Sequence, residues 1–151
     1  LFDVLCRAVL VLSQAAARAM TARGRGQIIN VSSVASFIAA GIYSAAKSYV
    51  TVLTESLSAE LSGTGVTATA LCPGFVHTEF HERAGMRMGQ LPAIAWVPVQ
   101  KLVREALADA DKGAVISVPG WQYKAVTSLL HIAPRAVARR AGLVNRRRDA
   151  L

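Results

Sequence analysis

Tyr43 and Lys47 are the two residues of this sequence whose types and spacing most clearly allow proton transfer. Side chains four positions apart share one face of a helix, with Cβ atoms about 5–6 Å apart. A free phenol has a pKa of about 10, and a depression of about three units, worth about 4 kcal/mol, would suit it for acid–base work at neutral pH. A neighbouring ammonium group stabilises the phenolate and therefore shifts the pKa in that direction.

Ser33 extends this pair to three candidate residues. It closes the run Gln27-Ile-Ile-Asn-Val-Ser-Ser33, whose apolar, β-branched character predicts a buried strand that ends at two serines. The carboxyl end of that strand would hold the Ser33 hydroxyl beside Tyr43. Taken alone, a Y-x-x-x-K spacing more often marks a surface tyrosine stacked on a lysine stem, so the surrounding sequence has to decide between the two interpretations.

Helix and strand signals alternate along the chain around these residues. Apolar residues at helical spacing predict helices over residues 1–22, 41–61, 99–110 and 121–130, with a further helical stretch from residue 134. Short apolar runs predict strands over residues 27–31, 66–72 and 114–118. Since helices between buried strands are typical of parallel sheets, we expect an α/β fold with a doubly wound parallel sheet and helices on both faces.

The second strand ends at Pro73 and Gly74. Glycine lets a backbone approach a ligand closely, and proline fixes the direction in which the chain leaves. The following segment, residues 75–97, lacks clean periodicity and contains His77 and His81. These histidines could serve a metal, but no third ligand stands at helical spacing, so we expect no metal site. We interpret the segment as a variable lid that shapes a substrate pocket.

Taken together, the motifs resemble the short-chain dehydrogenase/reductase (SDR) family. That family's pattern runs N-x-S-S, Y-x-x-x-K and P-G-x-V-x-T, and here the matching runs are N-V-S-S at residues 30–33, Y-S-A-A-K at 43–47 and P-G-F-V-H-T at 73–78. The resemblance extends from Phe2 to about Gly120. It implies that the fold is a partial Rossmann-like sheet and that the chain is the C-terminal part of one domain, residues 1–151, with a basic helical tail at about 132–151.

The resemblance also implies an activity and a set of site residues. The activity would be that of an NAD(P)-dependent oxidoreductase, which interconverts an alcohol and a carbonyl by hydride transfer with a tyrosine as acid and base. The implied catalytic residues are Ser33, Tyr43 and Lys47, with Ser32 structural. The implied cofactor-binding residues are Tyr43, Lys47, Pro73, Gly74, Val76 and Thr78.

Two departures from the family pattern leave a second interpretation open. The family carries an asparagine in its F-D-V-N-L-R run that helps to hold a water for proton relay, and here Leu5 stands in its place. The loop over residues 34–40 is also shorter than in many relatives, which could change how Ser33 meets Tyr43. The alternative is a truncated or degenerate relative that works by association and not by catalysis.

The glycine-rich half of a dinucleotide-binding domain has no counterpart in this sequence. Gly24-Arg-Gly26 precedes a strand, whereas a pyrophosphate-binding turn precedes a helix. We therefore interpret the chain as a fragment or a truncated gene product. The choice between NAD and NADP cannot be predicted, since the selector that follows the second strand of such a domain has no counterpart either.

Composition limits the remaining classes of partner. The chain is 53% apolar and carries a net charge of +8, but six arginines and one aspartate in residues 132–151 supply five of those charges. We therefore do not expect a nucleic-acid or membrane binder as the main interpretation, and a binder of either kind that acts through the basic tail stays open as a weaker alternative. Arg7, Gln14 and Arg18 interrupt the apolar stretch at residues 4–20, so we expect no spanning helix. The family resemblance implies a homo-oligomer formed through helices 1–22 and 41–61.

Cys6 and Cys72 both fall in apolar stretches without a ligand-like partner. Buried, reduced cysteines of this kind are typical of a reducing compartment. The sequence therefore predicts a cytoplasmic protein.

Overall fold

The computed structural model describes residues 1–76, 92–132 and 136–137. Its helices are the π-helix η1 (Asp3–Arg7), α1 (Ala8–Ala22), the 3-10 helix η2 (Val34–Phe37), α2 (Gly41–Glu60), the 3-10 helix η3 (Ala93–Ala95), α4 (Val99–Asp111) and α5 (Trp121–Ile132). Its strands are β1 (Gly26–Val31), β2 (Val66–Leu71), β3 (Phe75–Val76), β4 (Trp96–Val97) and β5 (Ile116–Ser117). The expected order of helices and strands is confirmed. The predicted basic tail lies almost entirely outside the described residues.

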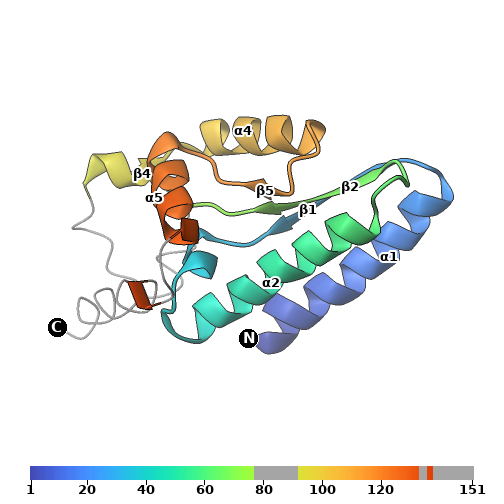
Figure 1. Ribbon diagram of the computed structural model, residues 1–151, viewed down its shortest axis with the longest axis horizontal. Coiled ribbons are helices and arrows are strands. Elements are labelled where there is room, and N and C mark those ends of the chain that lie inside the picture. The colour runs from blue at the N-terminus through green and yellow to red at the C-terminus, as the bar shows by residue number, and fades with distance from the viewer. Residues whose placement is uncertain (77–91, 133–135, 138–151) are drawn as a thin grey trace.

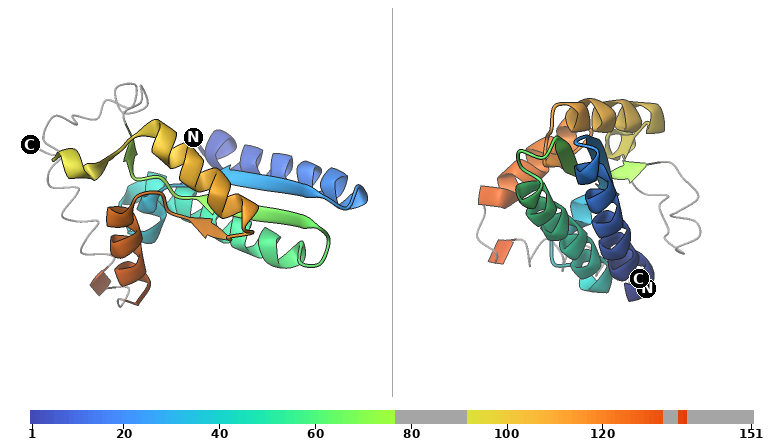
Figure 2. Two further views of the ribbon diagram at one scale, coloured as in Figure 1. Left: turned by 90° about the horizontal axis from the view of Figure 1, so that it is seen from above. Right: turned by 90° about the vertical axis from the view of Figure 1, so that its right-hand side faces the viewer.

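A parallel sheet forms the centre of the molecule, with strand order β1-β2-β5. The register pairs Gly26 with Val66 and Val31 with Leu71, and β5 continues it by pairing Ser117 with Leu71 on the other side. Helices α1 and α2 cover one face and α4 covers the other (Figures 1 and 2). The prediction of an α/β fold with helices on both faces is therefore confirmed.

Alternate residues of β1 contribute to two separate parts of the core. Ile28 packs into the cluster beneath α1 and α2, which also contains Ala17, Leu57, Leu61, Val66 and Ala68. Ile29 faces the opposite way and packs against the cluster beneath α4, which contains Leu71, Val76, Val97, Leu102 and Ala106. This alternation is what a strand buried on both faces requires.

A buried amide joins the three elements that carry most of the candidate site. Asn30 of β1 accepts a hydrogen bond of 3.1 Å from the Ser13 hydroxyl of α1 and donates one of 3.0 Å to the Thr54 hydroxyl of α2. All three side chains are buried. Because a buried amide is costly when it lacks partners, this arrangement fixes how both helices lie on the strand.

The first helix requires one correction. Asp3–Ala22 is long and apolar enough to cross a membrane by length and composition, so the expectation that its charged and polar residues rule this out was too strict. A helix in the core of a protein passes the same test. Here one side of the helix packs inward, because Ser13 bonds Asn30 and Ala17 enters the core. The sequence also did not predict that its first turn would be a π-helix.

Candidate active site

The candidate site lies where β1 and β2 end. Ser32 and Ser33 follow β1, and Pro73 and Gly74 follow β2 at the same edge of the sheet. The Ser32 N–H donates a hydrogen bond of 2.7 Å to the Leu71 carbonyl, and the next link joins Val34 N–H to the Pro73 carbonyl at 3.0 Å. Ligands of open parallel sheets bind outside the carboxyl ends of the strands, so this edge is where a ligand is expected.

Ser33 is held in place by its own loop. Its backbone is extended, and its hydroxyl oxygen accepts a hydrogen bond of 3.1 Å from the N–H of Ala35, which caps η2. The Ser33 side chain also hydrogen-bonds Tyr43. The short loop over residues 34–40 therefore still brings the serine to the tyrosine.

Tyr43 and Lys47 occupy one face of α2, as their spacing predicts. The Lys47 ammonium lies 5.7 Å from the centroid of the Tyr43 ring. It donates a hydrogen bond of 2.9 Å to the backbone carbonyl of Val31, the last residue of β1. The structure thus brings Ser33, Tyr43 and Lys47 together at one end of the sheet.

The electrostatics of this cluster differ from the expectation. Burial raises the pKa of the Tyr43 phenol above its ordinary value, and the hydrogen bond with Ser33 only partly opposes that rise. Burial also lowers the pKa of Lys47, and electrostatic interactions with Cys72 and Cys6 oppose that shift only in part. The expected depression of the phenol pKa is therefore wrong for this structure. The physical reason is that burial disfavours the charged phenolate.

Ser32 has contacts that fit a structural role. It is buried, and its hydroxyl donates a hydrogen bond of 2.8 Å to the backbone carbonyl of Lys47. A second hydrogen bond, of 2.7 Å, joins it to the hydroxyl of Thr51. Ser32 therefore fastens the second turn of α2 to the end of β1, and this is the turn that carries Lys47.

The turn after β2 contains the predicted cofactor-binding residues. Pro73 and Gly74 lie at the sheet edge, whereas the side chain of Val76 is buried in the core beneath α4. Only the backbone of Val76 is therefore left to face a ligand. Thr78, His77 and His81 lie outside the described residues.

The sequence did not single out Tyr123, which packs against this turn. Its hydroxyl accepts a hydrogen bond from the N–H of Phe75 and donates one to the carbonyl of Ala95. A Cβ at position 74 would collide with its ring, so Gly74 is the residue that this packing requires. The only signal in the sequence is an aromatic residue shortly after a strand and a Pro-Gly pair.

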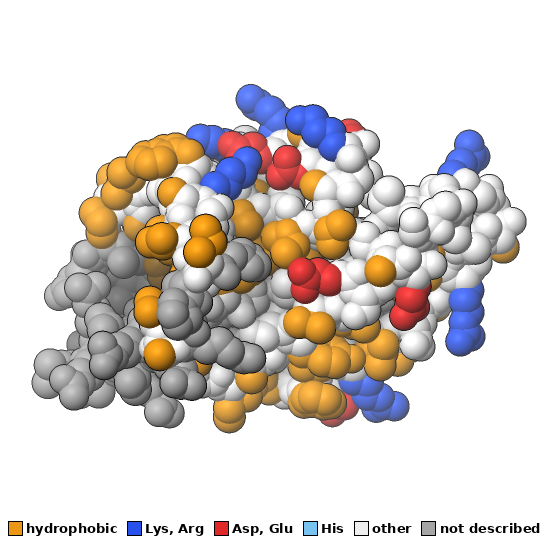
Figure 3. Space-filling model, viewed as in Figure 1, with side chains coloured by type: hydrophobic (Ala, Val, Ile, Leu, Met, Phe, Trp, Pro, Cys, Tyr) orange, Lys and Arg blue, Asp and Glu red, His pale blue; other side chains and the backbone are white. Residues whose placement is uncertain are grey.

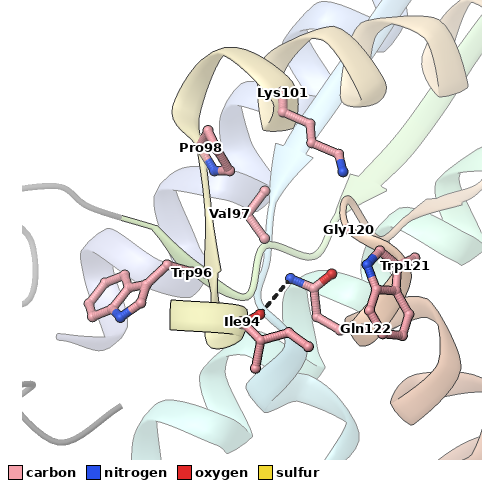
Figure 4. Close-up of a pocket in the computed structure, with 8 residues that line it drawn as sticks. All are labelled: Ile94, Trp96, Val97, Pro98, Lys101, Gly120, Trp121 and Gln122. Carbon is pink, nitrogen blue, oxygen red and sulfur yellow. Dashed lines mark hydrogen bonds between the residues drawn. The ribbon is translucent and has the colours of Figure 1, made fainter. Parts of the chain in front are cut away.

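A shallow hollow of about 190 Å³ lies beside η3 and the start of α5 (Figure 4). Its lining includes Trp96, Lys101, Trp121 and Gln122, and the Gln122 side chain donates a hydrogen bond of 3.1 Å to the Ile94 carbonyl. Ser33, Tyr43 and Lys47 do not line it. The hollow is therefore distinct from the candidate site.

Leu5 lies in η1, the π-helical turn that precedes α1. Its neighbour Cys6 is buried and close enough to Lys47 to affect the pKa of that residue. Leu5 directly precedes Cys6 in the chain, and its aliphatic side chain carries no hydrogen-bonding group. Among the described residues, no three His, Cys, Asp or Glu side chains gather as a metal site would require.

The donors at the site fit a ribose and a carbonyl oxygen. Lys47 carries three N–H groups, of which Val31 takes one in the described structure, and the phenol and serine hydroxyls can each donate or accept. These groups suit the nicotinamide end of a dinucleotide. A pyrophosphate needs a helix N-terminus behind a glycine-rich turn, and this sequence contains no such turn.

Comparison with known proteins identifies the family of this chain. The family described as short chain dehydrogenase matches residues 1–88. Galactitol 2-dehydrogenase of Cereibacter sphaeroides is 46% identical over 72 residues, which cover 44% of this chain and 28% of that enzyme. Gluconate 5-dehydrogenase of Gluconobacter oxydans (strain 621H) is 36% identical over 110 residues, which cover 66% of this chain and 43% of that enzyme.

A solved structure has a similar fold. It is a short-chain dehydrogenase from Sphingobium yanoikuyae in complex with NADPH, with a TM-score of 0.73 and 28% identity over 90% of this chain and 57% of that one. The chain thus spans less than two thirds of the length of each of these relatives.

Proposed function

Because the chain belongs to the short-chain dehydrogenase family, we propose that it carries the catalytic residues of an NAD(P)-dependent oxidoreductase that interconverts an alcohol and a carbonyl. The observation that carries this proposal is the cluster of Ser33, Tyr43 and Lys47 at the carboxyl ends of β1 and β2. A hydrogen-bonded serine and phenol beside an ammonium group form a set of donors suited to a carbonyl oxygen.

Each of the three residues has its own role in this reaction. The nicotinamide, when bound, supplies or accepts the hydride at the substrate carbon. In the reducing direction, Tyr43 gives its proton to the carbonyl oxygen as that oxygen becomes an alcohol, and it takes the proton back in oxidation. Ser33 hydrogen-bonds the substrate oxygen, and Lys47 holds the nicotinamide ribose and stabilises the phenolate that forms. The raised pKa of Tyr43 keeps the proton in place at neutral pH and so suits reduction.

The cofactor is NAD or NADP. The Sphingobium relative was solved with NADPH, which supports a nicotinamide cofactor for this chain as well. Pro73, Gly74 and the backbone of Val76 form the turn that would meet the nicotinamide ring; Thr78, the remaining residue of the family pattern, lies outside the described residues. The choice between the two cofactors depends on a ribose selector that this sequence does not contain.

The substrate is a small alcohol or carbonyl compound. Galactitol and gluconate, the compounds named for two relatives, are oxidised at a secondary alcohol of a polyhydroxylated chain. They form the first panel to assay, together with simple ketones. We do not propose nucleic acid or membrane lipid as a partner.

We also propose that the protein forms a homo-oligomer through α1 and α2. Hydrophobic side chains gather over these helices on the face shown in Figure 3. Among the exposed hydrophobic residues of these elements are Val4, Val11 and Leu12 in or just before α1 and Ile42 and Val52 on α2, each more than half exposed. Contact with a second copy would cover them.

Buried free Cys6 and Cys72 support a cytoplasmic location.

Hydride transfer by the full-length protein tests the proposal directly. Oxidation of NADPH or NADH with a carbonyl substrate, followed by absorbance, would support it if Tyr43→Phe abolishes the signal. The competing role, a non-catalytic relative that only associates, is favoured by Leu5 at the family's asparagine position. It predicts oligomers without turnover in the wild-type protein.

A further inference from the structure

Tyr123 occupies an unusual position between two strands. Its hydroxyl accepts a hydrogen bond of 3.1 Å from the N–H of Phe75 in β3 and donates one of 2.6 Å to the carbonyl of Ala95, directly before β4. The residue itself belongs to α5, 48 positions beyond Phe75. One phenol thus bridges three segments that are far apart in the sequence.

The register of the small sheet shows what this hydroxyl replaces. In the large sheet, a strand N–H bonds to the carbonyl that precedes its partner, as Ala70 N–H does to Val115 while Ala70 pairs with Ile116. In the small sheet Phe75 pairs with Trp96. By the same offset, the Phe75 N–H faces the Ala95 carbonyl, and the Tyr123 hydroxyl lies between the two groups.

The ring of Tyr123 also packs against this turn. It lies so close to Gly74 that a Cβ at that position would overlap it. It also packs against the core residues beneath α4 and those around Cys72. The position of the turn at residues 73–75 is therefore determined by both ends of one side chain.

Further hydrogen bonds surround Tyr123 at the start of α5. Its backbone carbonyl accepts a hydrogen bond of 2.8 Å from the buried hydroxyl of Thr127, and its neighbour Gln122 bonds the Ile94 carbonyl. Burial raises the pKa of the phenol, despite the hydrogen bond from Phe75, so the hydroxyl keeps the proton that it donates to Ala95. The first turn of α5 thus donates side-chain hydrogen bonds to two consecutive carbonyls of η3, from Gln122 to Ile94 and from Tyr123 to Ala95.

From this geometry we propose that Tyr123 is a positioning residue for the cofactor. Its hydroxyl lies between the Phe75 N–H and the Ala95 carbonyl, where a direct backbone hydrogen bond would otherwise join these segments. Its ring packs against Gly74. Through these two contacts Tyr123 determines the position of the turn at residues 73–76. The inference rests on the proposed function, since it takes that turn to be the one that meets the nicotinamide. Tyr123 touches no reacting atom.

Tyr123→Phe in the full-length protein is the central test, because it removes the hydroxyl and keeps the ring. The amide of Phe75 loses its acceptor, and its hydrogen exchange should speed up by about tenfold, as expected for one lost hydrogen bond. Phe75 and Ala95 would then no longer be joined through the hydroxyl, so the turn would be held less firmly, and KM for the nicotinamide cofactor should rise by about five- to tenfold while kcat stays within about twofold. Tyr49→Phe on α2 makes the same chemical change elsewhere and should alter neither quantity.

A pair of substitutions tests the ring. Gly74→Ala should raise KM for the cofactor strongly in the presence of the Tyr123 ring and much less in a Tyr123→Ala background. Such non-additivity is expected only for groups in contact that share one effect. A residue that merely stabilises the fold would lower the melting temperature in both backgrounds by additive amounts and leave KM unchanged.

The outcomes separate this inference from the proposed function. If the wild-type protein transfers no hydride, the proposed function fails, while hydrogen exchange at Phe75 still tests the inserted hydroxyl. If the wild-type protein is active and Tyr123→Phe changes neither the Phe75 exchange nor KM for the cofactor, the positioning role is overturned. Faster exchange together with a higher KM supports it.

Discussion

The ammonium of Lys47 donates a hydrogen bond of 2.9 Å to the carbonyl of Val31 at the outer edge of the sheet. Ser32 directs its N–H toward Leu71 of β2, so the backbone groups of Val31 point the other way, and Val31 is 56% exposed. Lys47 thus satisfies a carbonyl that β2 does not reach. Burial raises the pKa of the neighbouring Tyr43 in the same structure.

Replacing Tyr43 tests the acid–base role most directly. Tyr43→Phe in the full-length protein should lower kcat by at least about a hundredfold, because the proton donor is lost. Affinity for the cofactor should remain nearly intact, since the ring and Lys47 stay in place. Steady-state kinetics and a cofactor titration measure the two quantities. Tyr49→Phe, on the same helix, is the matched control, and substantial turnover by Tyr43→Phe would remove Tyr43 from the role.

The pH dependence of reduction should follow the pKa of Tyr43. A donor whose pKa is raised keeps its proton to higher pH, so kcat/KM for carbonyl reduction should fall only above the ordinary phenol value of 10.0. Ser33 lowers this pKa by its hydrogen bond, so Ser33→Ala should move the alkaline limb of the profile further up. A limb that moves down in Ser33→Ala, or stays in place, would contradict the assigned contact between the two side chains.

The larger part of the fold could be predicted because the helices and buried strands have strong periodicity and the site residues stand at fixed places within them. Tyr43 and Lys47 share a helix face by spacing alone. The raised pKa of Tyr43 could not be predicted, since spacing does not report burial. The two-residue strands β3 and β4 are too short for any period, and the contacts of Tyr123 join residues far apart in sequence.

Leu5→Asn asks whether the missing family asparagine limits the rate. If a water-mediated proton relay operates beside Lys47, the variant in the full-length protein should raise kcat. It also replaces an aliphatic side chain in η1 and should lower the free energy of unfolding, by up to about 2–4 kcal/mol where that side chain is packed. Steady-state kinetics measures the change in kcat, and urea unfolding measures the change in the free energy of unfolding. An unchanged rate in a folded variant would mean that the proton takes another route.

The buried amide network should be the most sensitive polar site of the fold. Thr54→Val keeps the shape of the side chain but leaves the Asn30 amide without its acceptor, so the free energy of unfolding should fall by about 1–3 kcal/mol. Thr54→Ser keeps the hydroxyl and is the matched control, with a cost of about 1 kcal/mol for the lost methyl group. Equal losses in the two variants, measured by urea unfolding, would show that the hydrogen bond contributes little.

Residues 1–151 expressed alone should bind a nicotinamide cofactor poorly. Lys47 and the turn at residues 73–76 can meet the nicotinamide end, but the sequence offers no glycine-rich turn and helix N-terminus for the pyrophosphate. We therefore expect a Kd for NADPH no better than about 1 mM. Titration followed by NADPH fluorescence measures it, and micromolar binding would contradict this expectation.

The same chain should self-associate through β1. This strand lies at the edge of the described three-stranded sheet, and the backbone groups of Gln27 and Ile29 point away from β2, as in edges that template pairing with another chain, while Lys47 binds the Val31 carbonyl at the end of the strand. Val31→Lys places a charge at its exposed end and should reduce the association, because charged residues block edge pairing. Light scattering at several protein concentrations compares the association of the wild-type chain with that of Val31→Lys. A wild-type chain that stays monomeric, or a variant that associates equally well, would show that β1 is not the contact.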